Sequence, residues 1–240
     1  MKHVNWTTIR LLLMVALVIF LFSFTAHRNA NRKLKKAVVF FVGNNLPLLK
    51  QETVNKLLIE NKKDAQSITK DKLDLNKLEK ALNTHDMIEK SDVFVSIDGV
   101  LKAVVKQKTP VARVFDGEHS FYIDYKGNTM PLSTNFTARV LLVSGKINKN
   151  NTNDLAELFR TIHDDEFLKK NIIAAQIMSN GSVLLLNRNY SYQIDFGQPI
   201  SIQTKFDKYK AFFQKAVLDS SLYKYKTIHL RFAQQVVCTK

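Results

Sequence analysis

The stretch Val93-Phe-Val-Ser-Ile-Asp-Gly-Val-Leu-Lys-Ala-Val-Val105 has apolar residues at every second position on both sides of an Asp-Gly pair. The alternating residues are Val93, Val95, Ile97, Leu101, Ala103 and Val105. An Asp-Gly pair between two such runs is typical of a β-hairpin turn. Pro110 follows, and it cannot continue a central strand because it has no backbone N–H. The sequence therefore predicts a hairpin with one buried face, which ends before Pro110.

Upstream of this hairpin, the pattern predicts one strand and two short helices. Residues 37–42 are β-branched and aromatic, except for one alanine, which favours a strand. Apolar residues recur at helical spacing in residues 49–58 and again in residues 75–82, where Asp74 is suited to cap the helix. The order strand, helix, helix, strand, strand over residues 37–109 predicts one small α/β unit.

Ahead of this unit, residues 11–26 contain no charge, glycine or proline. Counted from Trp6 to Ala26, the helix would be about 31 Å long at 1.5 Å per residue, close to the roughly 30 Å of a hydrocarbon core. Trp6 suits the membrane interface, and Arg10 can extend its guanidinium to the same level. The sequence predicts a membrane-spanning helix at residues 11–27, preceded by a tail at residues 1–10.

A cleavable signal peptide is the main alternative to this anchor. A cut after Ala26 would leave Phe24 at a position that requires a small residue, which favours an uncleaved helix. A core helix of a soluble protein is a weaker alternative, because the stretch is apolar on all faces.

Charge is concentrated around the predicted anchor. The first 36 residues hold seven Lys and Arg and no acid, out of a formal net charge of +15 for the chain. We expect residues 28–36 to lie against anionic lipid headgroups, where each cation contributes about 1 kcal/mol. The side chains expected at the membrane surface are Trp6, Arg10, Arg28, Arg32 and Lys33.

A literal positive-inside count would keep the large part of the chain in the cytoplasm, but charge bias is a tendency, so it leaves the orientation open.

Nucleic acid is not favoured as a partner. Beyond residue 36 the lysines are interleaved with acids, and no nucleic-acid-binding motif occurs.

From residue 110 to residue 240 the pattern is mainly that of short strands separated by turn dipeptides. Strands are predicted at residues 111–115, 120–124, 139–143, 172–178, 183–186, 191–196, 228–232 and 236–238, and helices at residues 153–169 and 206–217. The predicted fold class is α+β: one transmembrane helix, a small unit at residues 37–109, and a larger β-rich domain with flanking helices at residues 110–240.

No motif for nucleotide binding, nucleophilic catalysis or metal binding occurs in the chain. Residues 163–166, His-Asp-Asp-Glu, would point around a helix and could not converge on one ion. Asp124 and Asp195 have no second carboxylate placed near them, and the lone Cys238 is expected to be an ordinary strand residue. The sequence predicts no catalytic residue, no metal, no cofactor and no small-molecule substrate.

Several short motifs follow one another along the second half of the chain. They are Lys108-Thr-Pro-Val-Ala-Arg113, Phe121-Tyr-Ile-Asp124, Leu142-Val-Ser-Gly145, Ile228-His-Leu-Arg-Phe232 and Val236-Val237. Together with the order of elements, these motifs resemble those of the FtsQ/DivIB family of bacterial cell-division proteins. The first three are similar to the run that joins the family's POTRA domain to its β domain, and the last two to its C-terminal strand.

This resemblance implies a POTRA-like domain at residues 37–109 and a single-pass protein of the bacterial inner membrane. Most of the chain would be periplasmic, at the division septum, which is opposite to the literal charge count. The implied role is a non-enzymatic divisome scaffold that links FtsB/DivIC-like and FtsL-like proteins to septal peptidoglycan synthesis. A partner segment would add a strand to the C-terminal edge of the β domain.

The implied docking residues are Arg231, Phe232, Ala233, Gln234, Gln235, Val236 and Val237, of which the first two match the family's Arg-aromatic pair. The alternative for these two is that Arg231 is solvated and Phe232 belongs to the core. Two other functions remain open from the sequence: a membrane-anchored enzyme of the cell envelope, and a POTRA-type chaperone or transport component.

Overall fold

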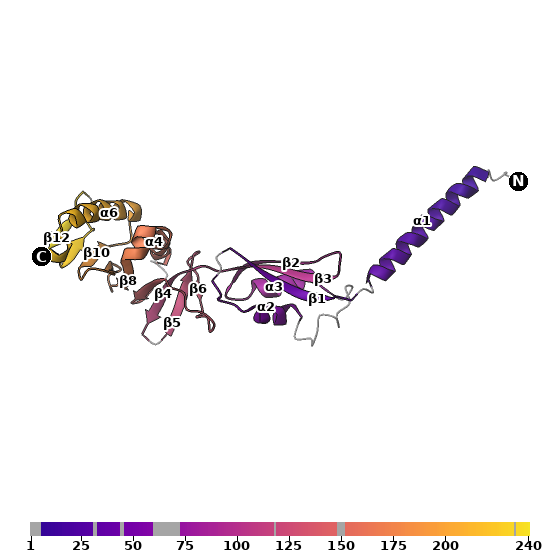
Figure 1. Cartoon of the computed structure of the whole chain (residues 1–240), viewed down its shortest axis with the longest axis horizontal. Coiled ribbons are helices and arrows are strands. Elements are labelled where there is room, and N and C mark those ends of the chain that lie inside the picture. Colours follow the sequence, from indigo (N-terminus) through magenta and orange to yellow (C-terminus); the bar gives the residue numbers. More distant parts are fainter. Residues whose placement is uncertain are drawn as a thin grey trace. The chain divides into compact units, whose positions relative to one another are not determined.

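The computed structural model describes residues 6–30, 33–43, 46–59, 73–117, 119–147, 152–232 and 234–240, without the side chains of residues 29 and 30. Arg32 and Ala233 lie outside the described residues. By its contacts the chain divides into two units, one of Met1–Asn45 with Leu49–Gln107 and one of Leu46–Leu48 with Lys108–Lys240 (Figure 1).

The first helix, α1 (Trp6–Ala30), exposes its apolar side chains along its whole length. Its segment Trp6–Arg28 is long and apolar enough to cross a membrane, and none of it is buried by the rest of the chain. The Arg10 guanidinium lies 5.6 Å from the centre of the Trp6 ring, so the two side chains expected at the interface are in contact. Hydrocarbon is the environment that suits such a surface.

The first unit beyond α1 contains the five elements in the predicted order: β1 (Lys36–Val42), α2 (Gln51–Leu58), α3 (Leu75–Asn83), β2 (Ile88–Val95) and β3 (Val100–Gln107). The strands form a sheet in the order β1-β3-β2, in which β1 is parallel to β3 and β2 is antiparallel to it. Asp74 accepts a hydrogen bond from the Lys77 backbone N–H at 3.0 Å and caps α3 as expected. The core includes Val39, Val54, Leu58, Leu78, Leu82, Leu101, Ala103 and Val105.

The turn of the β2–β3 hairpin corrects one expectation. Ile97 was expected to alternate into the core with Val93, but it lies in the turn between the strands and its side chain is 98% exposed. The reason is that β2 ends at Val95 and β3 begins at Val100, so residues 96–99 form the turn and Ile97 lies inside it. Ser96 closes it by bonding from both its N–H and its hydroxyl to the Val100 carbonyl, each at 2.9 Å.

In the second unit, the described residues form a sheet of nine strands. Helices lie against this sheet (Figure 1). The strands are β4 (Pro110–Asp116), β5 (His119–Asp124), β6 (Thr129–Met130), β7 (Leu141–Ser144), β8 (Ile172–Ile177), β9 (Val183–Asn187), β10 (Gln193–Gly197), β11 (Thr227–His229) and β12 (Val237–Thr239). The helices are α4 (Thr152–Asp164), α5 (Glu166–Asn171), α6 (Ile202–Leu218) and the 3-10 helix η3 (Leu222–Lys224). The order across the sheet is β12-β11-β10-β9-β8-β7-β4-β5-β6.

The predicted helix at residues 153–169 is in fact two helices. Asp165 adopts an extended backbone between α4 and α5, and its side chain accepts the Leu168 N–H at 2.9 Å, so it caps the second helix. Asp165 also pairs with Lys210 of α6. A capping carboxylate that favours the start of a new helix explains why the continuous helical pattern was wrong here.

Two strand predictions were too long, and two short elements were missed. The strand expected at residues 139–143 begins at Leu141, and the one expected at residues 228–232 ends at His229. The strand β6 and the helix η3 are only two and three residues long, which is too short for a periodic signal.

Three polar side chains lie inside the core of the second unit. The Asn187 amide donates to the hydroxyls of Tyr192 and Tyr209, each at 3.1 Å, and the two hydroxyls are 2.9 Å apart. Burial raises the pKa of both tyrosines, so both stay neutral. This satisfied network ties β9 and α6 to the residue just before β10, as buried polar groups require.

The Asp165 cap gives a testable stability prediction. Asp165→Ala removes both the cap and the ion pair, and should cost about 1–2 kcal/mol. Asp165→Asn keeps a capping oxygen but loses the charge, so it should cost less than about 1 kcal/mol. Thermal unfolding of the full-length chain in detergent measures both.

The loss of stability caused by Asp165→Asn should depend on pH. Burial raises the pKa of Asp165, but hydrogen bonds from Lys210 and the Leu168 N–H outweigh this and leave that pKa below its ordinary value of 3.8. A lowered folded-state pKa stabilises the fold above 3.8, and the contribution disappears as the pH falls through the folded value. The difference between wild type and Asp165→Asn should therefore shrink below pH 3.8. A difference that stays constant would contradict a role for the charge.

Candidate functional site

The C-terminal end of the large sheet is built by a crossover through α6. Strand β11 is parallel to β10, so the chain must cross the sheet between them, and α6 provides this connection (Figure 1). Ile228 of β11 and Leu230 just after it are 0% and 2% exposed, which fixes the returning chain in the core. Strand β12 then pairs antiparallel with β11 and is the last strand at this side of the sheet.

Strand β12 is an open edge within the described part of the chain. Its three residues pair with β11 on one side, and the sheet continues from there to β10. The backbone N–H and C=O groups on its other side are placed to pair with an added strand. The side chain of Cys238 packs against the core from this strand.

Beside this edge, Arg231 sits in a small polar cluster on the surface of β10 and β11. Asp195 and His229 are opposite one another in the parallel pair, and His229 Nδ1 lies 2.8 Å from Asp195 Oδ2. Arg231 Nη2 bonds to the same Asp195 oxygen and lies 3.3 Å from His229 Nδ1. The Asp195 side chain is 17% exposed and the Arg231 side chain 55%, so the carboxylate holds an arginine that still faces solvent.

Gly197 allows Arg231 to come this close. It has a φ of +70°, and a Cβ added to it would lie 3.1 Å from the Arg231 Cβ. A larger residue would therefore meet the arginine in addition to straining the backbone. The position selects glycine both for its backbone conformation and for the contact.

Lys205 of α6 supports the same end of β10 from the core side. It is 8% exposed, and its ammonium donates to the carbonyls of Phe196 and Gln198 at 2.9 and 2.7 Å. Burial lowers the pKa of Lys205, while the charge of Asp195 opposes this shift. The buried ammonium ties helix and strand together.

The predicted docking residues lie in and around the loop between β11 and β12. Phe232 is 44% exposed, so it is not a core residue. Gln234 and Gln235 are exposed, and Val236 packs against the core. Of the predicted docking residues that the structure describes, only Val237 is in β12, so the docking edge expected at residues 233–237 is mostly loop and the strand itself is Val237–Thr239.

Sequence reasoning missed the residues that hold Arg231. Asp195 was noticed as an acid without a partner, but its partners His229 and Arg231 are 34 and 36 residues away in the chain. Gly197 belonged to a strand-end turn and gave no signal of a close contact. Only the parallel pairing of β10 with β11 brings these residues together.

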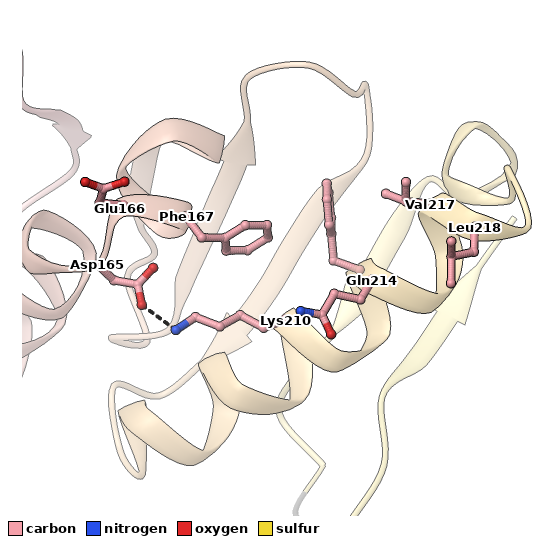
Figure 2. Close-up of a pocket in the computed structure, with 8 residues that line it drawn as sticks. Asp165, Glu166, Phe167, Lys210, Gln214, Val217 and Leu218 are labelled. Carbon is pink, nitrogen blue, oxygen red and sulfur yellow. Dashed lines mark hydrogen bonds and ion pairs between the residues drawn. The ribbon is translucent and has the colours of Figure 1, made fainter.

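An apolar groove of about 750 Å³ lies between α5 and α6 (Figure 2). Its wall consists of Phe167, Phe213, Gln214, Val217 and Leu218, and the ion pair between Asp165 and Lys210 closes one end. Figure 2 shows that the two charged side chains point toward each other.

Two further hollows flank α4. One, of about 410 Å³, contains Tyr125 and Asp164, whose side chains share a hydrogen bond of 2.7 Å. That bond raises the pKa of Tyr125. Burial raises the pKa of Asp164, but hydrogen bonds from Tyr125 and His163 outweigh it and leave that pKa below its ordinary value. Acid–base catalysis requires a group whose pKa is shifted toward neutral pH, and neither of these two pKa values is shifted in that direction.

The second hollow, of about 370 Å³, combines apolar walls with Arg139, His163, Lys169 and Arg188. Among the residues that the structure describes, no group of three or more His, Cys, Asp or Glu side chains could hold a metal ion. Burial raises the pKa of the Cys238 thiol, which disfavours the nucleophilic thiolate.

Comparison with known proteins finds one family match, and it covers most of the second unit. The family model described as FtsQ/DivIB, C-terminal related, matches residues 109–239, which include all nine strands of the large sheet. No curated protein matches the chain.

The contact between Gly197 and Arg231 gives a prediction with a matched control. Gly197→Ala and Gly117→Ala both place a side chain at positive φ, 70° and 65°, but nothing lies within 4 Å of the Gly117 position. Both should lose about 1–3 kcal/mol from backbone strain. Gly197→Ala should lose about 1 kcal/mol more, because Arg231 must move. Equal losses in thermal unfolding would show that the arginine is not held there.

Proposed function

The chain belongs to the FtsQ/DivIB family of non-enzymatic cell-division proteins, and from this premise we propose that it is a divisome scaffold whose partner docks along β12. The family and the apolar helix α1 together support a single-pass protein of the inner membrane. The observation that carries the proposal is the open edge of β12 together with the exposed pair Arg231 and Phe232 in the loop that leads into it.

The chemistry of this edge fits an extended peptide with acidic and apolar side chains. Strand addition would satisfy the outward backbone groups of β12, as in other sheets that bind peptides. Asp195 bonds to one terminal nitrogen of Arg231, and the rest of the guanidinium can take a partner carboxylate. Phe232 offers an apolar contact of the kind that carries much of the energy in an interface.

We propose that the segment that docks along β12 belongs to an FtsB/DivIC-like partner. This partner, together with an FtsL-like protein, would form a complex that reaches the septal peptidoglycan synthase. The first unit, with its strand, two helices and hairpin, is proposed to be the POTRA-like domain. No small-molecule substrate, nucleic acid, metal or cofactor takes part in the proposed mechanism.

Binding at the edge should depend on the two side chains. Arg231→Ala and Phe232→Ala should each weaken binding of the FtsB-like partner at least tenfold, since a hot-spot residue contributes more than about 1.4 kcal/mol. Binding can be measured by interferometry on the full-length chain in nanodiscs, with thermal unfolding as the check on folding.

Matched controls come from the same unit. Tyr223→Ala removes an aromatic side chain that is 78% exposed, and Lys215→Ala removes an exposed cation on α6. Both should leave the affinity unchanged. If all four variants bind alike, the docking site is not at this edge.

The proposed orientation can be tested separately. With the bulk of the chain in the periplasm, alkaline phosphatase fused after Lys240 should be active, and a fluorescent protein that folds only in the cytoplasm should stay dark. The reverse pattern would follow the positive-inside count of the flanking charges and would contradict a septal scaffold outside the cytoplasm.

A further inference from the structure

The turn of the β2–β3 hairpin carries an apolar side chain that nothing in the fold covers. Ile97 is 98% exposed, more than any other large apolar side chain in the described part of the chain. Single exposed apolar residues are common and need no explanation by themselves. Ile97 differs from them because its turn is bonded to the chain that leaves the membrane anchor.

The turn presents Ile97 in a fixed conformation. Ser96 and Gly99 close it through the bonds of the Ser96 N–H to the Val100 carbonyl and of the Gly99 N–H to the Ser96 carbonyl, both at 2.9 Å. Gly99 has a φ of +84°, which suits glycine. Because the turn is closed on itself, the isoleucine is held outward rather than folded back onto the sheet.

The same turn is tied to the chain that leaves the anchor. The Lys35 N–H bonds to the Gly99 carbonyl at 2.9 Å, and the Lys33 carbonyl lies 3.6 Å from where a Gly99 Cβ would be. The segment of α1 that is long and apolar enough to cross a membrane ends at Arg28, five residues before Lys33. Five residues reach at most about 18 Å when fully extended, so the turn cannot be far from the membrane surface.

The charges around the turn have the sign that an anionic bilayer attracts. Lys33 and Lys35 precede β1, Lys36 is its first residue, and Lys102 follows the turn on β3. The one carboxylate in the turn is Asp98. Its pKa lies below the ordinary value because of a hydrogen bond with Ser96 and the nearby charges of Lys102 and Lys35. The turn and the segments that adjoin it therefore carry four lysines against one carboxylate, and Lys35 and Lys102 are close enough to act on that carboxylate.

We propose that the turn at residues 96–99 is a second membrane contact, in which Ile97 enters the headgroup region of an anionic bilayer and the surrounding lysines lie over lipid phosphates. An apolar tip with a basic surround is the pattern of interfacial membrane binding. This contact is independent of the partner edge on β12. It would hold the first unit at two points, the anchor and the turn, and so restrict its orientation on the membrane.

A label at the turn can test the proposal in the full-length chain. Because Cys238 is the single cysteine, Cys238→Ser with Ile97→Cys gives one site for an environment-sensitive NBD label. The substitution removes no packing, since Ile97 is exposed. In nanodiscs that contain phosphatidylglycerol, the emission should shift to the blue, and lipids with nitroxide groups should quench it.

The matched control is the same label at Leu218→Cys, which replaces an apolar side chain that is 87% exposed in the other unit. That label should keep its aqueous emission. Adding Lys33→Glu and Lys102→Glu to the chain labelled at residue 97 should reduce the quenching. Because the nitroxide groups are carried by the lipids, quenching identifies a contact with the membrane itself.

Three results would overturn the proposal. Aqueous emission at residue 97 in anionic discs would show that the turn does not meet the bilayer. Equal quenching in discs of phosphatidylcholine alone would remove the role of anionic lipid. A blue shift that appears only after a division partner is added would identify a protein-binding surface instead.

Discussion

Burial of Ile228 and Leu230 in the core of the second unit is the constraint on which the C-terminal edge depends. These two side chains hold the chain parallel to β10 after it has crossed through α6, and the next residue, Arg231, then has to pass over Gly197. The apolar residues thus decide where the polar ones lie. Asp195 and His229 can meet Arg231 only because β11 is held in this register.

The buried supports around the edge are polar as well as apolar. Lys205 and the network of Asn187, Tyr192 and Tyr209 place hydrogen-bonded groups in the core between α6 and the strands β9 and β10. A buried polar group that lost its partner would cost about 1–3 kcal/mol, so these bonds favour a single arrangement of helix and sheet. A rigid edge suits strand addition, because the backbone groups of the receiving strand must be aligned before the partner arrives.

Local patterns predicted the elements well where the signal was long or chemically specific. The hairpin, the Asp74 cap and the apolar helix α1 follow from period, capping chemistry and length. The failures have physical causes. Ile97 continues an alternating pattern into a turn whose hydrogen bonds end the strand, and Asp165 restarts a helix inside a continuous apolar pattern. The Arg231 cluster joins residues more than 30 positions apart, which no local pattern contains.

The shortness of β12 determines where the binding energy of a docked partner can come from. A partner strand beside three residues gains about three backbone hydrogen bonds, each worth about 0.5–1.5 kcal/mol net. Their sum of about 1.5–4.5 kcal/mol is well below the roughly 8 kcal/mol of micromolar binding. The remainder must come from side chains, and in the proposed complex these are Phe232 and Arg231, both exposed in the loop that leads into β12. In the proposed complex, the strand would therefore set the register of a partner, while the loop before it would set affinity and selectivity.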